Sequence, residues 1–153
     1  MKKKIVFVIP SLAAGGGEKS LVNLLNCIDF NQYEIDLILL NKQGIFLNIL
    51  PQEVKIIDIG GDYVNFTKGF FKSIFVFSIK FKIRALFNRI LYCIKNIVIK
   101  NKAKAEQHSW QNLSFSIPNF DKEYDIAIAF LEKSSIYFTL EKLSAQKKIG
   151  WIH

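Results

Sequence analysis

Short apolar runs alternate with amphipathic segments along the first 60 residues. The apolar run at residues 4–9 predicts a strand, and residues 17–28 carry leucines three and four positions apart, which predicts a helix with one buried face. Further strands are predicted at residues 33–40 and 54–60, with a short helical piece in IFLNIL that ends at Pro51. Strands that are apolar on both faces favour a parallel sheet covered by helices.

The same alternation returns near the end of the chain. YDIAIAFLE, at residues 124–132, predicts a fourth strand, SSIYFTLEKL a short helix with Ser134 or Ser135 as its N-cap, and KKIGWIH a fifth strand. The predicted fold class is therefore α/β, with a Rossmann-like parallel sheet, helices on both faces and the strand order 3-2-1-4-5.

Residues 68–104 have a different pattern, because apolar residues at helical spacing alternate with positive charges. Two interpretations remain open: the apolar stripe covers the sheet, or this basic, Phe-rich segment lies on an anionic membrane surface. Lysines and arginines interrupt it too often for a transmembrane span. The candidate membrane contacts are Lys72, Lys80, Lys82, Arg84 and Arg89.

Charge is concentrated in this segment. The formal net charge is +8, and residues 68–104 contain ten Lys or Arg and no Asp or Glu, whereas the rest of the chain contains eleven basic and thirteen acidic residues. An acidic partner is therefore expected at this segment, and without a recognisable nucleic-acid-binding module we do not expect that partner to be nucleic acid.

Two further features bear on location. The start MKKKIVFVIPSLAAG has the basic beginning of a signal peptide, but its apolar run ends at Pro10 and is shorter than the roughly 7–15 residues of such peptides, which favours a strand. Cys27 and Cys93 stand in apolar helical surroundings without a metal-binding spacing, which indicates buried, reduced thiols in a cytoplasmic protein.

Three glycines, Gly15, Gly16 and Gly17, separate the first strand from the first helix. A helix that begins in such a turn offers unpaired backbone N–H groups to an anion, although a turn without a ligand would have the same sequence. The Walker pattern is absent, and the dinucleotide pattern GxGxxG has Ser20 at its third glycine position. With Asn41 where an acidic residue would bind the ribose, a nicotinamide-dependent oxidoreductase is disfavoured.

The predicted strand order brings three features to one edge of the sheet. The glycine turn follows strand one, Glu132 follows strand four and His153 ends strand five. In open parallel sheets ligands bind at the carboxyl ends of the strands where the order reverses. There His153 could bind a phosphate or a sugar hydroxyl or transfer a proton, and Glu132 could contact a ligand or cap the next helix.

Together these segments resemble the start of a retaining bacterial glycosyltransferase of family four. KIVFVIPSLAAGGGEKSLVNLLNCID matches a first strand followed by a GG-[AG]-E turn, and KKIGWIH matches a later strand that ends in W-x-H. YEIDLILL and YDIAIAFLEKSS extend the resemblance, which covers residues 2–67 and 121–153.

The resemblance implies the N-terminal, acceptor-side half of a GT-B architecture. Gly15, Gly16 and Gly17 would approach the diphosphate of a nucleotide sugar, His153 would act at the donor sugar or phosphates, and Glu132 would lie on the acceptor side. No metal or other cofactor is implied. The paired glutamates and the nucleotide-binding half of the family would follow His153, so residues 1–153 are expected to form a single Rossmann-like domain that lacks the C-terminal half and is weak or inactive alone.

The sequence thus predicts the acceptor-side domain of a cytoplasmic enzyme that transfers a sugar from a nucleotide-diphosphate sugar to a polysaccharide or lipid-linked acceptor. The alternative is a stand-alone Rossmann-like module that binds the anionic inner face of the cell membrane through residues 68–104.

Overall fold

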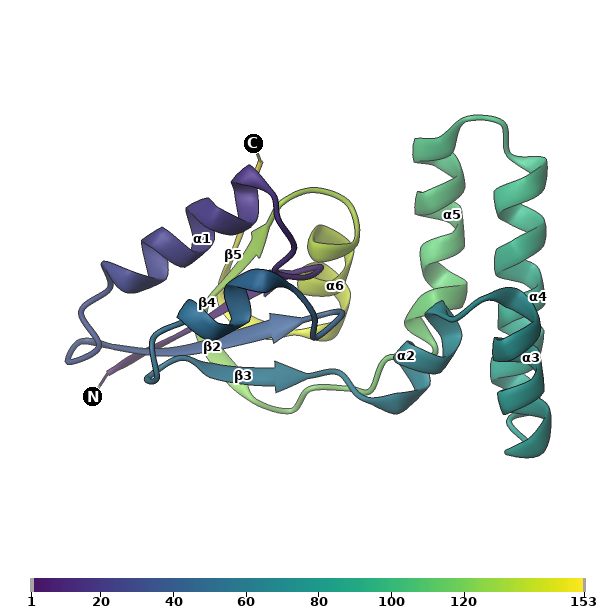
Figure 1. The fold of residues 1–153 in the computed structure, drawn as a ribbon, viewed down its shortest axis with the longest axis horizontal. Helices are drawn as coiled ribbons and strands as arrows, with labels where there is room; N and C mark the ends of the chain where they lie inside the picture. Colours follow the sequence, from purple (N-terminus) through teal and green to yellow (C-terminus); the bar gives the residue numbers. More distant parts are fainter. Residues whose placement is uncertain (1, 153) are drawn as a thin grey trace. The chain divides into compact units, whose positions relative to one another are not determined.

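Five parallel strands form the sheet in the computed structural model, which describes residues 2–152 (Figure 1). Their order is β3-β2-β1-β4-β5, the order that the sequence predicts. The strands are β1 (Lys3–Ile9), β2 (Tyr33–Leu39), β3 (Lys55–Asp58), β4 (Glu123–Phe130) and β5 (Ser144–Trp151). The predicted α/β class with a Rossmann-like parallel sheet is confirmed.

Side chains of β1 and β2 alternate between the two faces of the sheet. Ile5, Phe7 and Ile9 lie level with Ile35, Leu37 and Leu39 and form a buried cluster with α1 (Gly16–Asn26), flanked by the 3-10 helix η1 (Ile45–Ile49). The helix α6 (Ser134–Lys142) contacts β4, β1 and β5. Because parallel crossovers are right-handed and β1–α1–β2 runs opposite to β4–α6–β5, α1 and α6 cover opposite faces (Figure 1).

Several predicted boundaries differ from the observed ones. β5 begins at Ser144, three residues before the predicted start, because its pairing with β4 already begins there. The N-cap of α6 is Lys133, so the prediction of Ser134 or Ser135 as the cap is wrong. Both cysteines are free, but Cys27, predicted to be buried, is exposed.

Residues 60–118, which follow β3 and precede β4 in the sequence, form a compact unit of their own, here called unit 2. The sheet and its helices form unit 1. Unit 2 contains α2 (Gly61–Thr67), α3 (Phe70–Ile79), α4 (Ile83–Val98) and α5 (Lys102–Ser114). The sequence predicted a single Rossmann-like domain over residues 1–153. The sheet-covering interpretation of residues 68–104 is not supported, because many apolar side chains of α3 and α4 are exposed, Phe71 to 84%.

Unit 2 has an aromatic interior. The ring of Phe66 lies 6.3 Å from that of Phe77 and 5.4 Å from that of Tyr92. The chain turns between α3 and α4 at Phe81, whose φ of 52° is unusual for a residue other than glycine. Within residues 2–152, no helix combines the length and the apolar character needed to cross a bilayer.

Burial of Tyr63 makes a pH-dependent contribution to stability that can be measured. Burial, with a smaller contribution from Tyr92, raises the pKa of Tyr63 to about 12, whereas an unfolded tyrosine titrates near pH 10. The folded state therefore holds this proton more tightly, so its contribution is complete below pH ~10 and is lost as the pH rises toward 12, by up to about 1.4 kcal/mol per pH unit. In urea unfolding at a series of alkaline pH values, Tyr63→Phe is expected to lose stability less steeply than the wild type; equal slopes would contradict the assignment.

Candidate functional site

The glycine turn leads from β1 into the first turn of α1. Gly15 is the N-cap, with an extended backbone, and no side chain of the described residues caps the helix. A Cβ added to Gly16 would meet no atom within 4 Å, so the first turn of α1 is open at this residue. The N–H groups of Gly16, Gly17 and Glu18 begin the helix and lack the intrahelical partners that later residues have. The turn therefore presents backbone donors and the positive end of a helix dipole.

Glu18 lies on one side of this turn. A Cβ on Gly15 would come within 2.1 Å of the Glu18 Oε2 atom, so the carboxylate is folded back over Gly15. A carboxylate in the first turn interacts favourably with the helix dipole. An anionic ligand would therefore approach the amides from the open side, at Gly16, and not across Gly15.

Gly44 packs against the residue that begins the glycine turn, and the sequence did not predict this contact. Its φ of 136° is accessible mainly to glycine, and a Cβ there would lie 1.9 Å from the carbonyl oxygen of Leu12. The Leu12 N–H donates to the carbonyl oxygen of Gln43 at 3.0 Å. The loop after β2 thus fixes the start of the glycine turn. The sequence feature that could have indicated the role of Gly44 was the single glycine in NKQG, directly after a predicted strand.

The loop after β4 is the second part of this edge. β1 pairs with β4 up to Val8 and Ala129, so the two strands end side by side. Glu132 is exposed and stands between Leu131 (φ 72°) and Lys133 (φ 64°), two non-glycine residues with positive φ. Such backbone conformations are costly and cluster at functional sites. The structure brings the glycine turn and the Glu132 loop to adjacent strand ends, as predicted.

The end of β5 extends the same edge. Trp151 stacks on Phe130 of β4 with ring centroids 5.5 Å apart, and its carbonyl oxygen accepts a hydrogen bond from the Leu131 N–H at 3.0 Å. These contacts tie the Glu132 loop to β5. His153, the predicted catalytic residue, lies outside the described residues, so its role stays a prediction.

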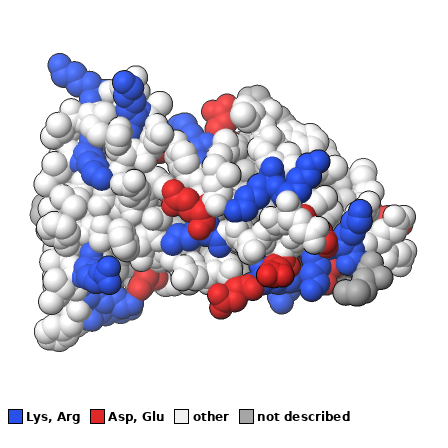
Figure 2. Space-filling model, turned by 180° about the vertical axis from the view of Figure 1, so that it is seen from behind, with Lys and Arg blue, Asp and Glu red and all other residues white. Residues whose placement is uncertain are grey.

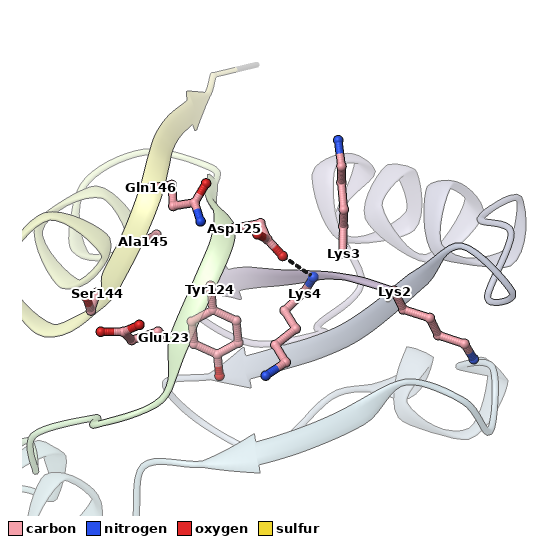
Figure 3. A pocket seen from close by; sticks show the side chains of 9 residues that line it. All are labelled: Lys2, Lys3, Lys4, Glu123, Tyr124, Asp125, Ser144, Ala145 and Gln146. Carbon is pink, nitrogen blue, oxygen red and sulfur yellow. Dashed lines mark hydrogen bonds between the residues drawn. The ribbon is translucent and has the colours of Figure 1, made fainter.

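A pocket lies at the opposite, amino-terminal edge of the sheet. Residues of β1, β4 and β5 line it, together with Lys2 (Figure 3). The side chains of Lys2, Lys3 and Lys4 point in different directions in Figure 3, and the backbone N–H of Lys4 donates to Asp125 Oδ2 at 2.7 Å. Because the three cations do not converge, this pocket lacks the geometry of an anion site.

A buried carboxylate on β2 is the other feature that the sequence analysis missed. Asp36 is fully buried, and its Oδ2 atom accepts hydrogen bonds from Tyr124 Oη at 2.7 Å and from Lys122 Nζ at 2.8 Å. Lys122 also pairs with Glu34 at 2.8 Å. Since Asp36 alternates with Ile35 and Leu37, it lies on the face opposite α1. A carboxylate without solvent access cannot meet a ligand, so this cluster is structural.

The cluster changes the ionisation of its partners. Burial, then the hydrogen bond to Asp36, raises the pKa of Tyr124 well above its usual range, so the phenol remains a donor. Burial alone would lower the pKa of Lys122, but its hydrogen bonds to Asp36 and Glu34 outweigh this and raise the pKa above its ordinary value. At neutral pH both groups therefore keep the protons that they donate to Asp36.

The five predicted membrane contacts do not all lie on the surface. Lys72, Lys80 and Arg84 are exposed. Lys82 is also exposed but forms an ion pair with Asp62. Arg89 is 8% exposed, and its guanidinium lies 5.4–5.6 Å from the ring centroids of three aromatic residues, Phe66, Phe70 and Tyr92. The prediction for Arg89 is therefore wrong, because cation–π packing holds it in the interior of unit 2.

The carboxyl edge combines open helix amides, a strained loop with an exposed carboxylate and an aromatic stack. Among residues 2–152, no group of three or more His, Cys, Asp or Glu side chains is arranged to hold a metal ion. The resemblance to family-four glycosyltransferases stays a prediction. Comparisons with protein-family models, curated proteins and solved structures found no match.

Proposed function

We propose that unit 1 is the acceptor-side half of a glycosyltransferase that uses a nucleotide-diphosphate sugar, with a polysaccharide or lipid-linked acceptor. The observation that carries the proposal is the pairing of β1 with β4 at the point where the strand order reverses. Because of that pairing, the glycine turn and the Glu132 loop follow adjacent strand ends, at the edge where open parallel sheets bind their ligands.

The chemistry of this edge suits the departure of a diphosphate. Negative charge develops on a diphosphate when the bond to the sugar breaks, and fixed N–H groups stabilise such charge without having to reorganise. The amides at Gly16 and Gly17 are donors of this kind. On the neighbouring loop, the exposed Glu132 carboxylate is held by a strained backbone. It would accept hydrogen bonds from hydroxyl groups of the acceptor substrate.

The first prediction tests the amide site. Gly16→Asp is expected to leave the fold intact, because a Cβ there meets no atom within 4 Å and an acidic residue in the first turn favours the helix. The new carboxylate would repel a phosphate, so binding of UDP or inorganic pyrophosphate should weaken at least about tenfold. The measurement is titration of the purified wild type and variant, monitored by the amide NMR shifts of residues 16 and 17.

Gly69→Asp is the matched control. Gly69 is the N-cap of α3 in unit 2, and a Cβ there also meets nothing within 4 Å, so the change adds the same charge to a comparable helix start. Binding should be unchanged in this variant. Equal weakening in both variants would mean that the added charge acts through the net charge of the chain and would contradict a site at Gly16.

Tighter binding of NAD than of UDP to the wild-type chain would favour a nicotinamide-dependent oxidoreductase instead.

Sugar transfer itself is tested by supplying a nucleotide-sugar-binding domain, either fused after His153 or added separately. Release of nucleoside diphosphate is expected only in its presence. Equal release by the chain alone would contradict the assignment of unit 1 to the acceptor side.

A further inference from the structure

Helix α4 packs with its polar side inward. Asn112 of α5 donates from Nδ2 to Asn88 Oδ1 at 2.8 Å and accepts at Oδ1 from Lys95 Nζ at 2.7 Å. Asn96 donates from Nδ2 to Ser109 Oγ at 2.8 Å. Asn88, Ser109 and Asn112 are buried. Polar side chains of α4 and α5 therefore hydrogen-bond to one another across the contact, whereas an amphipathic helix usually turns its apolar side inward.

The apolar residues of the same helices point outward. Ile83, Phe87, Ile90, Ile94 and Ile97 follow one stripe along α4, and Phe71, Phe75 and Ile79 follow one stripe along α3. Phe81, in the turn between the helices, is 87% exposed. We call these nine residues, with Val98, the docking face. So many large apolar side chains exposed within one small unit indicate an interaction site.

The inner hydrogen bonds fix the orientation of α4. Rotation of the helix to bury its apolar stripe would separate Asn88, Lys95 and Asn96 from their partners on α5. Buried polar groups that lose their partners are strongly destabilising. Unit 2 therefore cannot cover the docking face by repacking α4 without losing these hydrogen bonds.

The charge around the docking face indicates which kind of partner fits it. Residues 68–104 contain ten Lys or Arg and no Asp or Glu, and Lys72, Lys80 and Arg84 are exposed. In Figure 2, unit 2 lies at the left, with basic residues scattered over a mainly uncharged surface. A second copy would oppose these charges with the same charges. An anionic bilayer supplies lipid phosphates for the cations and an apolar region for the phenylalanines.

We propose that the docking face binds the surface of an anionic phospholipid bilayer, with α3 and α4 in the interface and Phe81 inserted between Lys80 and Lys82. No helix of the described residues can span the bilayer, so the helices lie along its surface. The proposal rests on unit 2 alone and does not depend on sugar transfer by unit 1.

The test is co-sedimentation of the full chain with vesicles. Binding to phosphatidylglycerol–phosphatidylcholine vesicles is expected at about 0.05 M NaCl, with weaker binding at about 0.5 M NaCl or to phosphatidylcholine alone. The combined variant Phe71→Ser, Phe75→Ser and Phe87→Ser should bind about 1000-fold more weakly, because each phenylalanine contributes about tenfold by leaving water. Leu140→Ser, at a position on α6 that is 59% exposed, as Phe87 is, is the control and should bind as the wild type does.

A charge variant provides an independent measurement. Lys72→Glu combined with Lys80→Glu changes exposed side chains only and should weaken binding to anionic vesicles by about tenfold or more. It decides the question if the serine variant fails to fold. Equal binding to neutral and anionic vesicles, or no binding at low salt, would overturn the proposal. So would a dimer, seen by analytical ultracentrifugation without lipid, that the serine variant converts to monomer, since a second copy would then cover the face.

Discussion

Asp36→Ala is expected to lower the free energy of unfolding by about 2–4 kcal/mol. The substitution removes the hydrogen-bond acceptor of the Tyr124 hydroxyl and one of the two carboxylate partners of Lys122. Tyr124 is buried near the start of β4. A buried hydroxyl without a partner loses its hydrogen bond and cannot regain one from water. The measurement is urea unfolding followed by circular dichroism.

Two variants separate the causes of this effect. Glu34→Gln removes the partner of Lys122 that is 47% exposed, and should cost less than about 1 kcal/mol because such pairs contribute little. Asp36→Asn keeps an acceptor for Tyr124 and should lose less stability than Asp36→Ala. A loss for Asp36→Ala no larger than that for Glu34→Gln would show that the buried cluster does not stabilise the sheet.

Gly44→Ala is expected to destabilise unit 1 by about 2–4 kcal/mol and to disturb the glycine turn. Its φ of 136° is unfavourable for alanine, and the added Cβ would collide with backbone atoms of Leu12, which cannot move aside as the end of a flexible side chain could. Since Leu12 lies just before the turn, the shift should also weaken pyrophosphate binding at Gly16. Urea unfolding and the pyrophosphate titration measure the two effects.

Gly60→Ala is the matched control for Gly44→Ala. Gly60 also has a positive φ, 86°, but a Cβ there meets no atom within 4 Å. It should show only the conformational cost, about 1–2 kcal/mol, with unchanged pyrophosphate binding. Equal losses of stability and binding in the two variants would mean that the contact with Leu12 has no role in shaping the turn.

The carboxyl edge of the sheet was predictable because its parts follow directly from local sequence. Apolar runs located the strands, and GGG located the start of α1, so the usual order of an open parallel sheet was enough to bring Gly16 and Glu132 to one edge. Asp36 and Gly44 were missed because their partners, Tyr124 and Leu12, are distant in the sequence. A single acidic residue in a strand, or a glycine after one, has many local explanations.

The sequence by itself determined the α/β class, the strand order and the concentration of positive charge at residues 68–104, because periodicity and composition are local properties. It could not determine which side of α4 faces inward. Hydrophobic periodicity shows that a helix has two different sides, and burial of the apolar side is only the usual outcome. The tertiary structure decided this, because Asn112 and Ser109 on α5 supply hydrogen-bond partners to the polar side of α4 and leave its apolar side exposed. Tertiary contacts also decided the position of Arg89. The charge pattern alone had assigned this cation to the surface, but three aromatic rings contributed by α2, α3 and α4 bury it.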